Sequence, residues 1–291
     1  MISCLLVAIL AGFASASDDL TVYYINTSHG DATLLESSGH FMLIDAGNKQ
    51  DSSAVIDYLK STGVGMLDYA VATSMNESAI GGMAEILKAF PVSIYADPSS
   101  SFSSTTKAAI KQQIESGQVG YQQGETGASF PFGAATIKIQ NTTTSTTNAS
   151  ANALSLTVGV GNVSFLFSGN QDLASTPATI WAVSGQGQDV SAASFATVSP
   201  QVLIFNTGIS PSAKILETLK KQKNQYLQTS KDGDVVISTD GSNYTVTTSN
   251  AKTMEKSTPV VTPTVKPVSG ETISLLSPGL SGANVTKSLA S

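Results

Sequence analysis

The chain has 291 residues, of which 41% are hydrophobic, and its mean hydropathy is +0.10. This length and composition exclude an intrinsically disordered chain, because there is enough apolar surface to build a core. The formal net charge of −6 at pH 7 argues against nucleic acid or an anionic membrane as the main partner, since both require clustered Lys and Arg. Only 12% of the residues are charged, about half the usual share of roughly 25%, whereas 42 are Ser and 31 are Thr. We therefore expect a surface rich in hydroxyl and amide groups.

Residues 1–16 have the pattern of a secretory signal peptide. The apolar run from Ile2 to Phe13 is too short to span a bilayer, and the small-residue sequence Ala14-Ser15-Ala16 follows it. A buried first element of the fold is the alternative. Cys4 is the only cysteine and would leave with the signal, so the mature chain would have neither a thiol nor a disulfide. The sequence thus predicts an extracellular or cell-surface location.

Asn-x-Ser/Thr sequons, the acceptors of N-linked glycans, are frequent in the chain. They begin at Asn26, Asn76, Asn141, Asn148, Asn162, Asn243 and Asn284. Glycosylation would agree with secretion, although any chain rich in Ser and Thr collects such tripeptides by composition alone. We treat these asparagines as candidate sites.

The first half of the chain predicts strands followed by alternating helices and strands. Three short strands are expected between Leu20 and Asp45, with turns at residues 28–31 and 37–39. Helical spacing over 54–59, 80–89 and 104–116 alternates with apolar runs over 67–72 and 92–95, which predicts a parallel sheet segment with crossover helices. A polar stretch follows.

The second half repeats this theme, so we expect two similar halves packed together. Strands are predicted over 135–139, 154–160, 163–167 and 202–205, a helix over 213–219, and a hairpin of 234–238 with 244–248. Asn141 to Ser150 is a Thr/Ser/Asn tract that predicts a surface loop. The Pro- and Thr-rich residues 251–291 predict an extended tail rather than a packed element. One domain over residues 17–250 is expected.

A series of short motifs resembles the metallo-β-lactamase fold superfamily, with the β-lactamase-like domain of ComEC-type competence proteins as the nearest branch. The series begins with Ile25-Asn26-Thr27-Ser28-His29-Gly30-Asp31-Ala32 and Met42-Leu43-Ile44-Asp45-Ala46-Gly47. It continues through Leu67-Asp68-Tyr69, Ile80-Gly81-Gly82, Ser164-Phe165-Leu166-Phe167-Ser168-Gly169 and later segments, in the family's order, over roughly residues 20–248. The resemblance implies an α/β fold, a four-layer αββα sandwich with two facing sheets and helices outside.

The same resemblance implies that the family's metal ligands have been lost. The family's Thr-His-x-Asp-x-Asp-His-x-Gly-Gly loop corresponds to residues 73–82, where Ser74, Asn76, Ser78 and Ala79 replace the ligands while Thr73, Gly81 and Gly82 remain. A bridging aspartate is replaced by Asn170 and a later histidine by Ser210. Zinc requires three or four nitrogen, thiolate or carboxylate donors, and a hydrolase of this kind needs the metal to activate water. We therefore predict a pseudoenzyme with no metal, no other cofactor and no catalytic residues.

Other catalytic arrangements receive little support from the sequence. His29 and His40 are the only histidines, and neither lies in a recognised nucleophile motif. Asp31 and Asp45 match family positions near the metal site, but turn capping and strand-end hydrogen bonding explain them as well. Lys214, Lys220, Lys221 and Lys223 lie on or after one predicted helix and indicate a solvated face.

Without chemistry, the unusual property that remains is the surface. Ser and Thr lose little side-chain entropy in a contact and can still hydrogen-bond, and low charge removes repulsion between copies. The leading hypothesis is a structural subunit of an extracellular layer, sheath or filament, whose main partner is the same chain in a homo-oligomer or lattice. The alternative is an extracellular binding module that uses the vacant cleft for a glycan, a small molecule or a partner protein.

Overall fold

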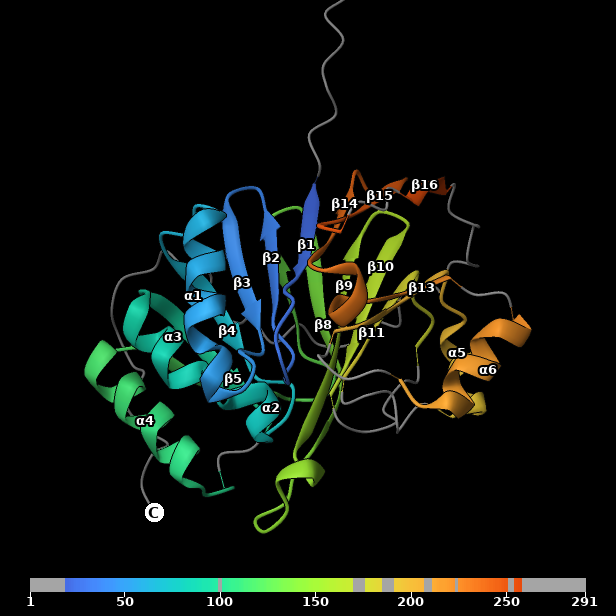
Figure 1. Ribbon diagram of the computed structural model, residues 1–291. Helices are drawn as coiled ribbons and strands as arrows, with labels where there is room; N and C mark the ends of the chain where they lie inside the picture. The colour runs from blue at the N-terminus through green and yellow to red at the C-terminus, as the bar shows by residue number, and fades with distance from the viewer. Residues whose placement is uncertain are drawn as a thin grey trace, which may run out of the picture.

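Two mixed β-sheets face each other in the computed structural model, and helices cover the outer face of each sheet (Figure 1). The structure describes residues 19–98, 101–169, 176–184, 191–206, 211–222, 225–250 and 254–257. Within them, sheet A has nine strands in the order β16-β15-β14-β1-β2-β3-β4-β5-β6, and sheet B has seven in the order β13-β12-β11-β10-β9-β8-β7. The predicted four-layer sandwich and α/β class are confirmed.

The strands of sheet A are β1 (Leu20–Tyr24), β2 (Thr33–Ser37), β3 (His40–Ile44), β4 (Leu67–Val71), β5 (Val92–Asp97), β6 (Gly120–Gln123), β14 (Val235–Thr239), β15 (Tyr244–Thr248) and β16 (Met254–Ser257). Those of sheet B are β7 (Ser129–Phe132), β8 (Ala135–Thr143), β9 (Ala153–Val160), β10 (Val163–Ser168), β11 (Ile180–Val183), β12 (Val202–Phe205) and β13 (Gln225–Gln228). The helices are η1 (Lys49–Asp51), α1 (Ser52–Ser61), α2 (Glu77–Ile80), α3 (Met83–Ala89), α4 (Thr105–Gly117), η2 (Ala149–Ala151), α5 (Ala192–Val198), α6 (Ala213–Gln222) and α7 (Thr229–Asp232).

The apolar side chains divide into three buried layers because successive strand residues point to opposite faces of a sheet. Tyr69 and Val71 of β4 belong to the core between the two sheets, whereas Ala70 belongs to the core between sheet A and its helices. Trp181 of β11 packs in the third core, under α5 and α6. β11 is buried along its whole length, as expected for a strand that pairs in parallel on both sides.

The predicted parallel segment with crossover helices is confirmed in sheet A. β3, β4, β5 and β6 are parallel neighbours. The connections between them carry α1, then α2 and α3, then α4, and Figure 1 shows these helices on one side of the sheet. The helix predicted over 80–89 is divided in two at Gly81 and Gly82. The carboxyl ends of these strands therefore meet at one edge, where the candidate site lies.

The middle of the chain contains more strand than the sequence indicated. The polar stretch after α4 contains β6 and β7, and β8 runs on to Thr143, so the first residues of the predicted loop at Asn141 to Ser150 belong to a strand. β6 and β7 contain Gly120 and Pro131, which weaken a strand pattern in the sequence but are tolerated at a sheet edge.

The carboxyl-terminal boundary also differs from the prediction. Met254–Ser257 form β16, which pairs with β15 in antiparallel fashion, so four residues assigned to the tail belong to sheet A. The predicted signal peptide and the remaining tail lie outside the described residues. Among the described residues, no helix is both long and apolar enough to cross a bilayer.

Candidate functional site

The loops at the carboxyl ends of β3 and β4 form the candidate site, because the resemblance places its metal ligands there. Ser74, Asn76, Ser78 and Ala79 lie in the loop after β4 and at the start of α2, whereas Asn170 and Ser210 lie outside the described residues. The loop is joined to both sheets: Asp45 N–H donates to the carbonyl of Val71 (2.8 Å), and Leu154 N–H donates to the carbonyl of Thr73 (2.7 Å).

Asp45 is the central polar group of this loop cluster. It follows β3 directly, has a φ of 58°, and is 2% exposed. Its carboxylate accepts hydrogen bonds from the backbone N–H of Thr73 (2.7 Å) and from the Thr73 hydroxyl (2.6 Å). Burial raises the pKa of the Asp45 carboxyl to about 7, against the lowering effect of the two hydrogen bonds. Asp45 thus anchors the next loop by strand-end hydrogen bonding, one of the two interpretations that the sequence left open.

The four positions that would carry ligands are occupied by local hydrogen bonds and packing. Ser74 Oγ accepts from the N–H of Asn76 (3.2 Å), and Asn76 Oδ1 accepts from the Ser150 hydroxyl (3.1 Å). The carbonyl of Ser78 accepts from the N–H of Asp31 (3.0 Å). Ala79 is buried and offers only its carbonyl, which accepts from Ala46 N–H (2.8 Å). These contacts hold the loops together.

The glycines that match the family motif are required by the close approach of the loops. A Cβ on Gly82 would lie 2.3 Å from the carbonyl oxygen of Ala46, and one on Gly30 would lie 2.4 Å from that of Ser78. A Cβ on Gly169, after β10, would lie 2.4 Å from the carbonyl oxygen of Thr73. Backbone packs on backbone at each position, so the motif glycines have a structural function.

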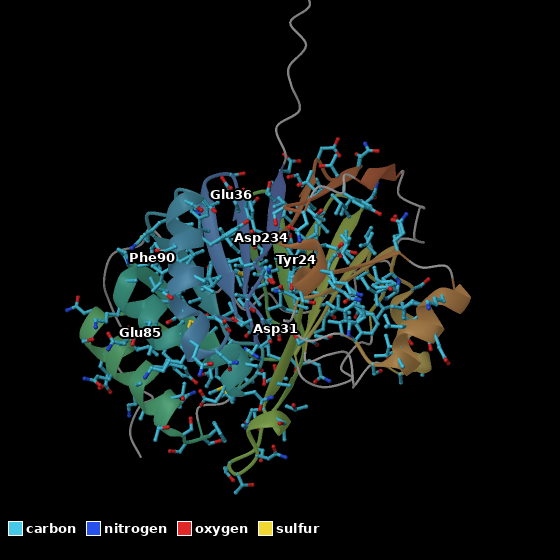
Figure 2. The ribbon with its side chains drawn as sticks, in the orientation of Figure 1. Tyr24, Asp31, Glu36, Glu85, Phe90 and Asp234 are labelled. Atoms are coloured by element: carbon cyan, nitrogen blue, oxygen red, sulfur yellow. The ribbon has the colours of Figure 1, made fainter. Side chains whose placement is uncertain are left out.

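A small polar cavity remains where the two sheets meet at this edge. It is lined by Asp31, Asp45, Thr73 and Asn206 among others, and its volume is about 10 Å³, near the minimum of roughly 10–15 Å³ that one water requires. Asp31 lies near the middle of the molecule, whereas Glu85 lies on the outer helical layer (Figure 2). The cavity enclosed by the described residues has room for one water-sized species.

Asn206 is a residue of this cavity that the sequence analysis missed. It follows β12 directly, is 3% exposed, and its Nδ2 donates to the carbonyl of Ala32 (2.9 Å) and to Thr33 Oγ1 (3.0 Å). Its Oδ1 is buried without a hydrogen-bond partner among the described residues. The only available signal was its position after a fully apolar strand, where polar side chains meet at the sheet edge.

The described residues at this edge do not fit the metal centre of the family that the sequence resembles. The described lining offers carboxylate, amide and hydroxyl oxygens, with no imidazole and no thiolate. In the described part of the chain, no group of three or more His, Cys, Asp or Glu side chains is placed to hold a metal ion. Zinc in this kind of site takes three or four such donors, so this donor set does not match a zinc site.

The two histidines are not placed as a catalytic base. His40 is the first residue of β3, at the end of the strand away from Asp45. Its Nδ1 lies 3.2 Å from Oδ1 of Asp68 in β4, and its side chain is 47% exposed. His29 is exposed. Within the described residues, neither ring hydrogen-bonds a serine hydroxyl. The serine-hydrolase alternative has no support in this arrangement.

The candidate glycosylation sites differ in exposure. Asn26, Asn148 and Asn162 are exposed, Asn76, Asn141 and Asn243 are half-buried, and Asn284 lies outside the described residues. The first three have the accessibility that a glycan requires.

Comparisons with known proteins bear on the fold. No family model and no curated protein matches the sequence. The metallo-beta-lactamase fold protein YhfI from Bacillus subtilis is similar in structure, with a TM-score of 0.50 and 11% identity over 72% of this chain and 97% of that chain. A diphosphatase from the PhnP family gives a TM-score of 0.47 and 14% identity over 72% of this chain and 94% of its own.

A metallo-beta-lactamase from Cronobacter sakazakii is also found, with a TM-score of 0.38 and 16% identity over 50% of this chain and 60% of that chain. The match therefore spans less than two thirds of the length of the Cronobacter enzyme. At these identities the likeness concerns the fold alone. Together with the two facing mixed sheets and their outer helices, the match to YhfI shows that the chain has the metallo-β-lactamase fold.

Proposed function

We propose that the chain is a degenerate, non-catalytic domain of the ComEC-like branch of this fold, secreted and used as a structural subunit of an extracellular layer, sheath or filament. The proposed loss of chemistry is supported by Ser74, Asn76, Ser78 and Ala79, whose groups form hydrogen bonds and packing contacts within the loops. The structural role is supported by the surface.

The sheet edges are the observation that carries the structural role. Natural proteins protect edge strands with charges, prolines or bulges, because an unprotected edge pairs with another chain. β7 carries an exposed proline, Pro131, but β6 (Gly-Tyr-Gln-Gln) and β13 (Gln-Tyr-Leu-Gln) have neither a charge nor a proline. Each of these two strands forms the edge of one sheet. β6 and the first part of β13 thus offer an uncharged edge to a second copy, whereas the N–H of Gln228 at the end of β13 already donates to Asp232 Oδ2 (2.9 Å).

The remaining surface favours association through polar groups. Among the described residues, Met66 is the one exposed large hydrophobic side chain, at 46% exposure, so an apolar patch is not the means of contact. With 12% charged residues in the whole chain, few Lys and Glu side chains would have to be ordered or desolvated in a contact.

Binding of a glycan, small molecule or partner in the vacant cleft is the second candidate. The part of the cleft that the described residues line, between Asp31, Asp45 and Asn206, is polar and has a volume of about 10 Å³.

The decisive experiment is assembly of the mature chain, residues 17–291, followed by sedimentation and electron microscopy at neutral pH. We expect ordered assemblies, and we expect Gln123→Lys on β6 or Gln225→Lys on β13 to reduce them because a charge protects the edge. Gln112→Lys, which adds the same charge to an exposed position on α4, is the matched control. A mature chain that stays monomeric at high concentration contradicts the structural role.

Two further measurements test the other parts of the proposal. N-terminal sequencing of the native protein checks cleavage near Ala16 and hence secretion. Calorimetric titration with zinc, together with phosphodiesterase and β-lactamase assays, checks the pseudoenzyme: we expect neither tight stoichiometric binding nor turnover. One or two tightly bound zinc ions with turnover would restore the enzyme interpretation.

A further inference from the structure

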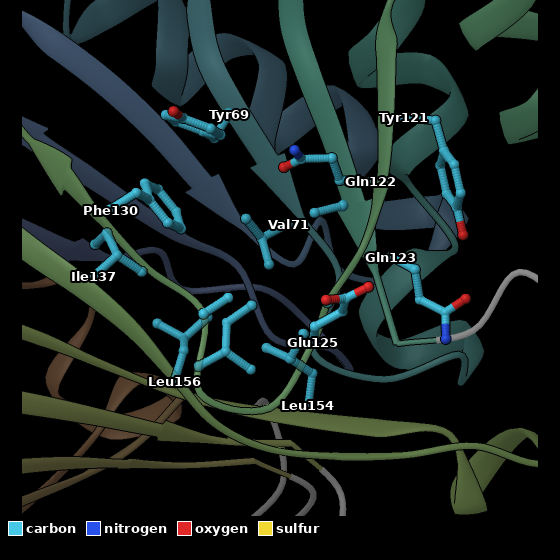
Figure 3. A pocket seen from close by; sticks show the side chains of 14 residues that line it. Tyr69, Val71, Tyr121, Gln122, Gln123, Glu125, Phe130, Ile137, Leu154 and Leu156 are labelled. Atoms are coloured by element: carbon cyan, nitrogen blue, oxygen red, sulfur yellow. The ribbon is translucent and has the colours of Figure 1, made fainter. Parts of the chain in front are cut away.

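A second, much larger cavity lies between the two sheets, away from the strand-end loops. Its volume is about 420 Å³, and its walls come from β4, β5 and β6 of sheet A and from β7, β8 and β9 of sheet B. Figure 3 shows the apolar side chains Tyr69, Val71, Phe130, Ile137, Leu154 and Leu156 around it. Native interiors contain few voids larger than one water, so a cavity of this size that is partly open to solvent is available to a ligand.

The sequence of β5 and β6 explains why the sandwich stays open at this place. Val71, Ala96 and Gln122 are register partners on β4, β5 and β6, so a small alanine lies at the middle of this row of sheet A. Ile94 and Ala96 are only half-buried, although β5 is an interior strand. The chain then crosses to sheet B at Gly124, where a Cβ would lie 2.1 Å from Leu154 Cδ1, and this contact closes one end of the cavity.

The opening carries two polar side chains that the fold does not use. Gln122 on β6 is half-buried, and Glu125, which follows the crossing, is exposed; both line the cavity, and neither side chain hydrogen-bonds within the described chain. In Figure 3 they lie on one side of the cavity, across from Phe130 and Ile137. The lining contains no Lys or Arg. In Figure 3 the Gln122 amide points toward Tyr69, whereas the Glu125 carboxylate lies beside Leu154. A carboxylate or phosphate near Glu125 would be repelled by its charge, whereas a hydroxyl or ammonium group could donate a hydrogen bond to it.

We propose that this inter-sheet cavity is a binding site for an unbranched aliphatic chain that ends in a hydrogen-bond donor, the chemistry of a long-chain alcohol or amine. At roughly 30 Å³ for a water, which is close to a methylene group, about 420 Å³ holds a chain on the order of ten carbons with its polar end. The chain packs between the apolar walls, and the donor group binds at Glu125. This inference does not rest on the assembly proposal, because it uses the side chains that line the cavity rather than the pairing of a strand edge. β6 takes part in both, since Gln122 and Gln123 line the cavity.

The test is a titration of the mature chain with N-phenyl-1-naphthylamine, an uncharged apolar fluorophore, followed by displacement with decylamine, decanol and decanoate below their micellar concentrations. We expect one saturable site from which decylamine and decanol displace the probe at least tenfold more effectively than decanoate. Absence of saturable binding, or equal displacement by decanoate, overturns the proposal.

Two variants locate the site. Ala96→Leu fills the cavity and should weaken probe and decylamine binding at least tenfold, whereas Ala54→Leu, at an exposed position on α1, is the matched control and should leave both unchanged. Glu125→Gln should bring decanoate and decylamine closer in affinity, and because Glu125 is exposed this measurement does not depend on whether Ala96→Leu folds. The assignment is contradicted if the Ala96→Leu variant has the circular dichroism spectrum of the wild type and still binds the probe as tightly. It is also contradicted if Glu125→Gln keeps the wild-type preference for decylamine over decanoate.

Discussion

At the scale of single residues, Asp45 makes the stability of the fold depend on pH. Its pKa rises from 3.8 to about 7 on folding because of burial, so the folded state holds the proton more tightly than the unfolded state. The free energy of unfolding is therefore highest at or below pH 4 as far as this group is concerned, and falls as the pH rises toward 7, by up to roughly 4 kcal/mol.

Asp45→Asn tests this linkage because an amide cannot ionise but can still accept from Thr73 N–H and donate to the Thr73 hydroxyl. We expect urea unfolding of the variant to lack the decline between pH 4 and pH 7 that the wild type shows. Glu115→Gln, which removes an exposed carboxylate on α4, should keep the wild-type profile. Parallel profiles for wild type and Asp45→Asn would show that the carboxyl is ionised in the folded protein across this range.

At the scale of elements, one ion pair ties α4 to the parallel strands of sheet A. The Lys107 ammonium pairs with the Asp97 carboxylate, with side chains 14% and 0% exposed, and the Tyr121 hydroxyl donates to Asp97 Oδ1 (3.0 Å). Ser104 caps the helix by accepting from the N–H of Lys107 (3.1 Å). The first turn of α4 is thereby fixed on the ends of β5 and β6.

Lys107→Met should destabilise the protein by about 3–5 kcal/mol, because it leaves the Asp97 charge buried without its partner. Lys111→Met, on the same helix, removes a lysine whose side chain is 49% exposed and whose Nζ lies 3.9 Å from Glu115 Oε1. This variant should lose at most about 0.5 kcal/mol of unfolding free energy. Urea unfolding at pH 7 compares the two, and Asp97→Asn combined with Lys107→Met should recover part of the loss. Equal effects at both lysines would contradict the importance of burial.

Most elements with strong apolar patterns could be predicted from the sequence, and those at sheet edges could not. β11 (Ile180–Val183) is apolar and interior but was not predicted, because a run of four residues is too short to distinguish from a loop. β1 to β5, β9, β10, β12 and the β14–β15 hairpin follow from alternating or continuous apolar runs. β6 and β13 are short and rich in Gln, and β7 contains Pro131, so their pairing depends on the neighbouring strand rather than on local preference. In the site, the replaced ligand positions could be named from the motif, but the contribution of Asn206 depends on contacts with Ala32 and Thr33, which are far away in the chain.

At the scale of the whole molecule, the low charge content predicts how assembly responds to salt. Screening weakens contacts between charged groups, with a Debye length of about 10 Å at 0.1 M and about 3 Å at 1 M. Since 12% of the residues are charged, we expect the proposed assemblies to sediment alike from low salt to about 1 M NaCl. Edge variants such as Gln123→Lys provide the comparison, because any residual association should become salt-dependent. Dissolution of wild-type assemblies by salt would mean that ion pairs hold them.

The pairing of β1 with β14 has a consequence for synthesis. Leu20 is the register partner of Thr239, so the first and nearly the last strands of the domain are neighbours in sheet A. In a ribosome-bound chain that ends before β14, one side of β1 has no hydrogen-bonded neighbour. Pairing between strands so far apart in the sequence slows folding. The domain therefore closes only after most of its length has been made, so a partly synthesised chain leaves this side of sheet A open.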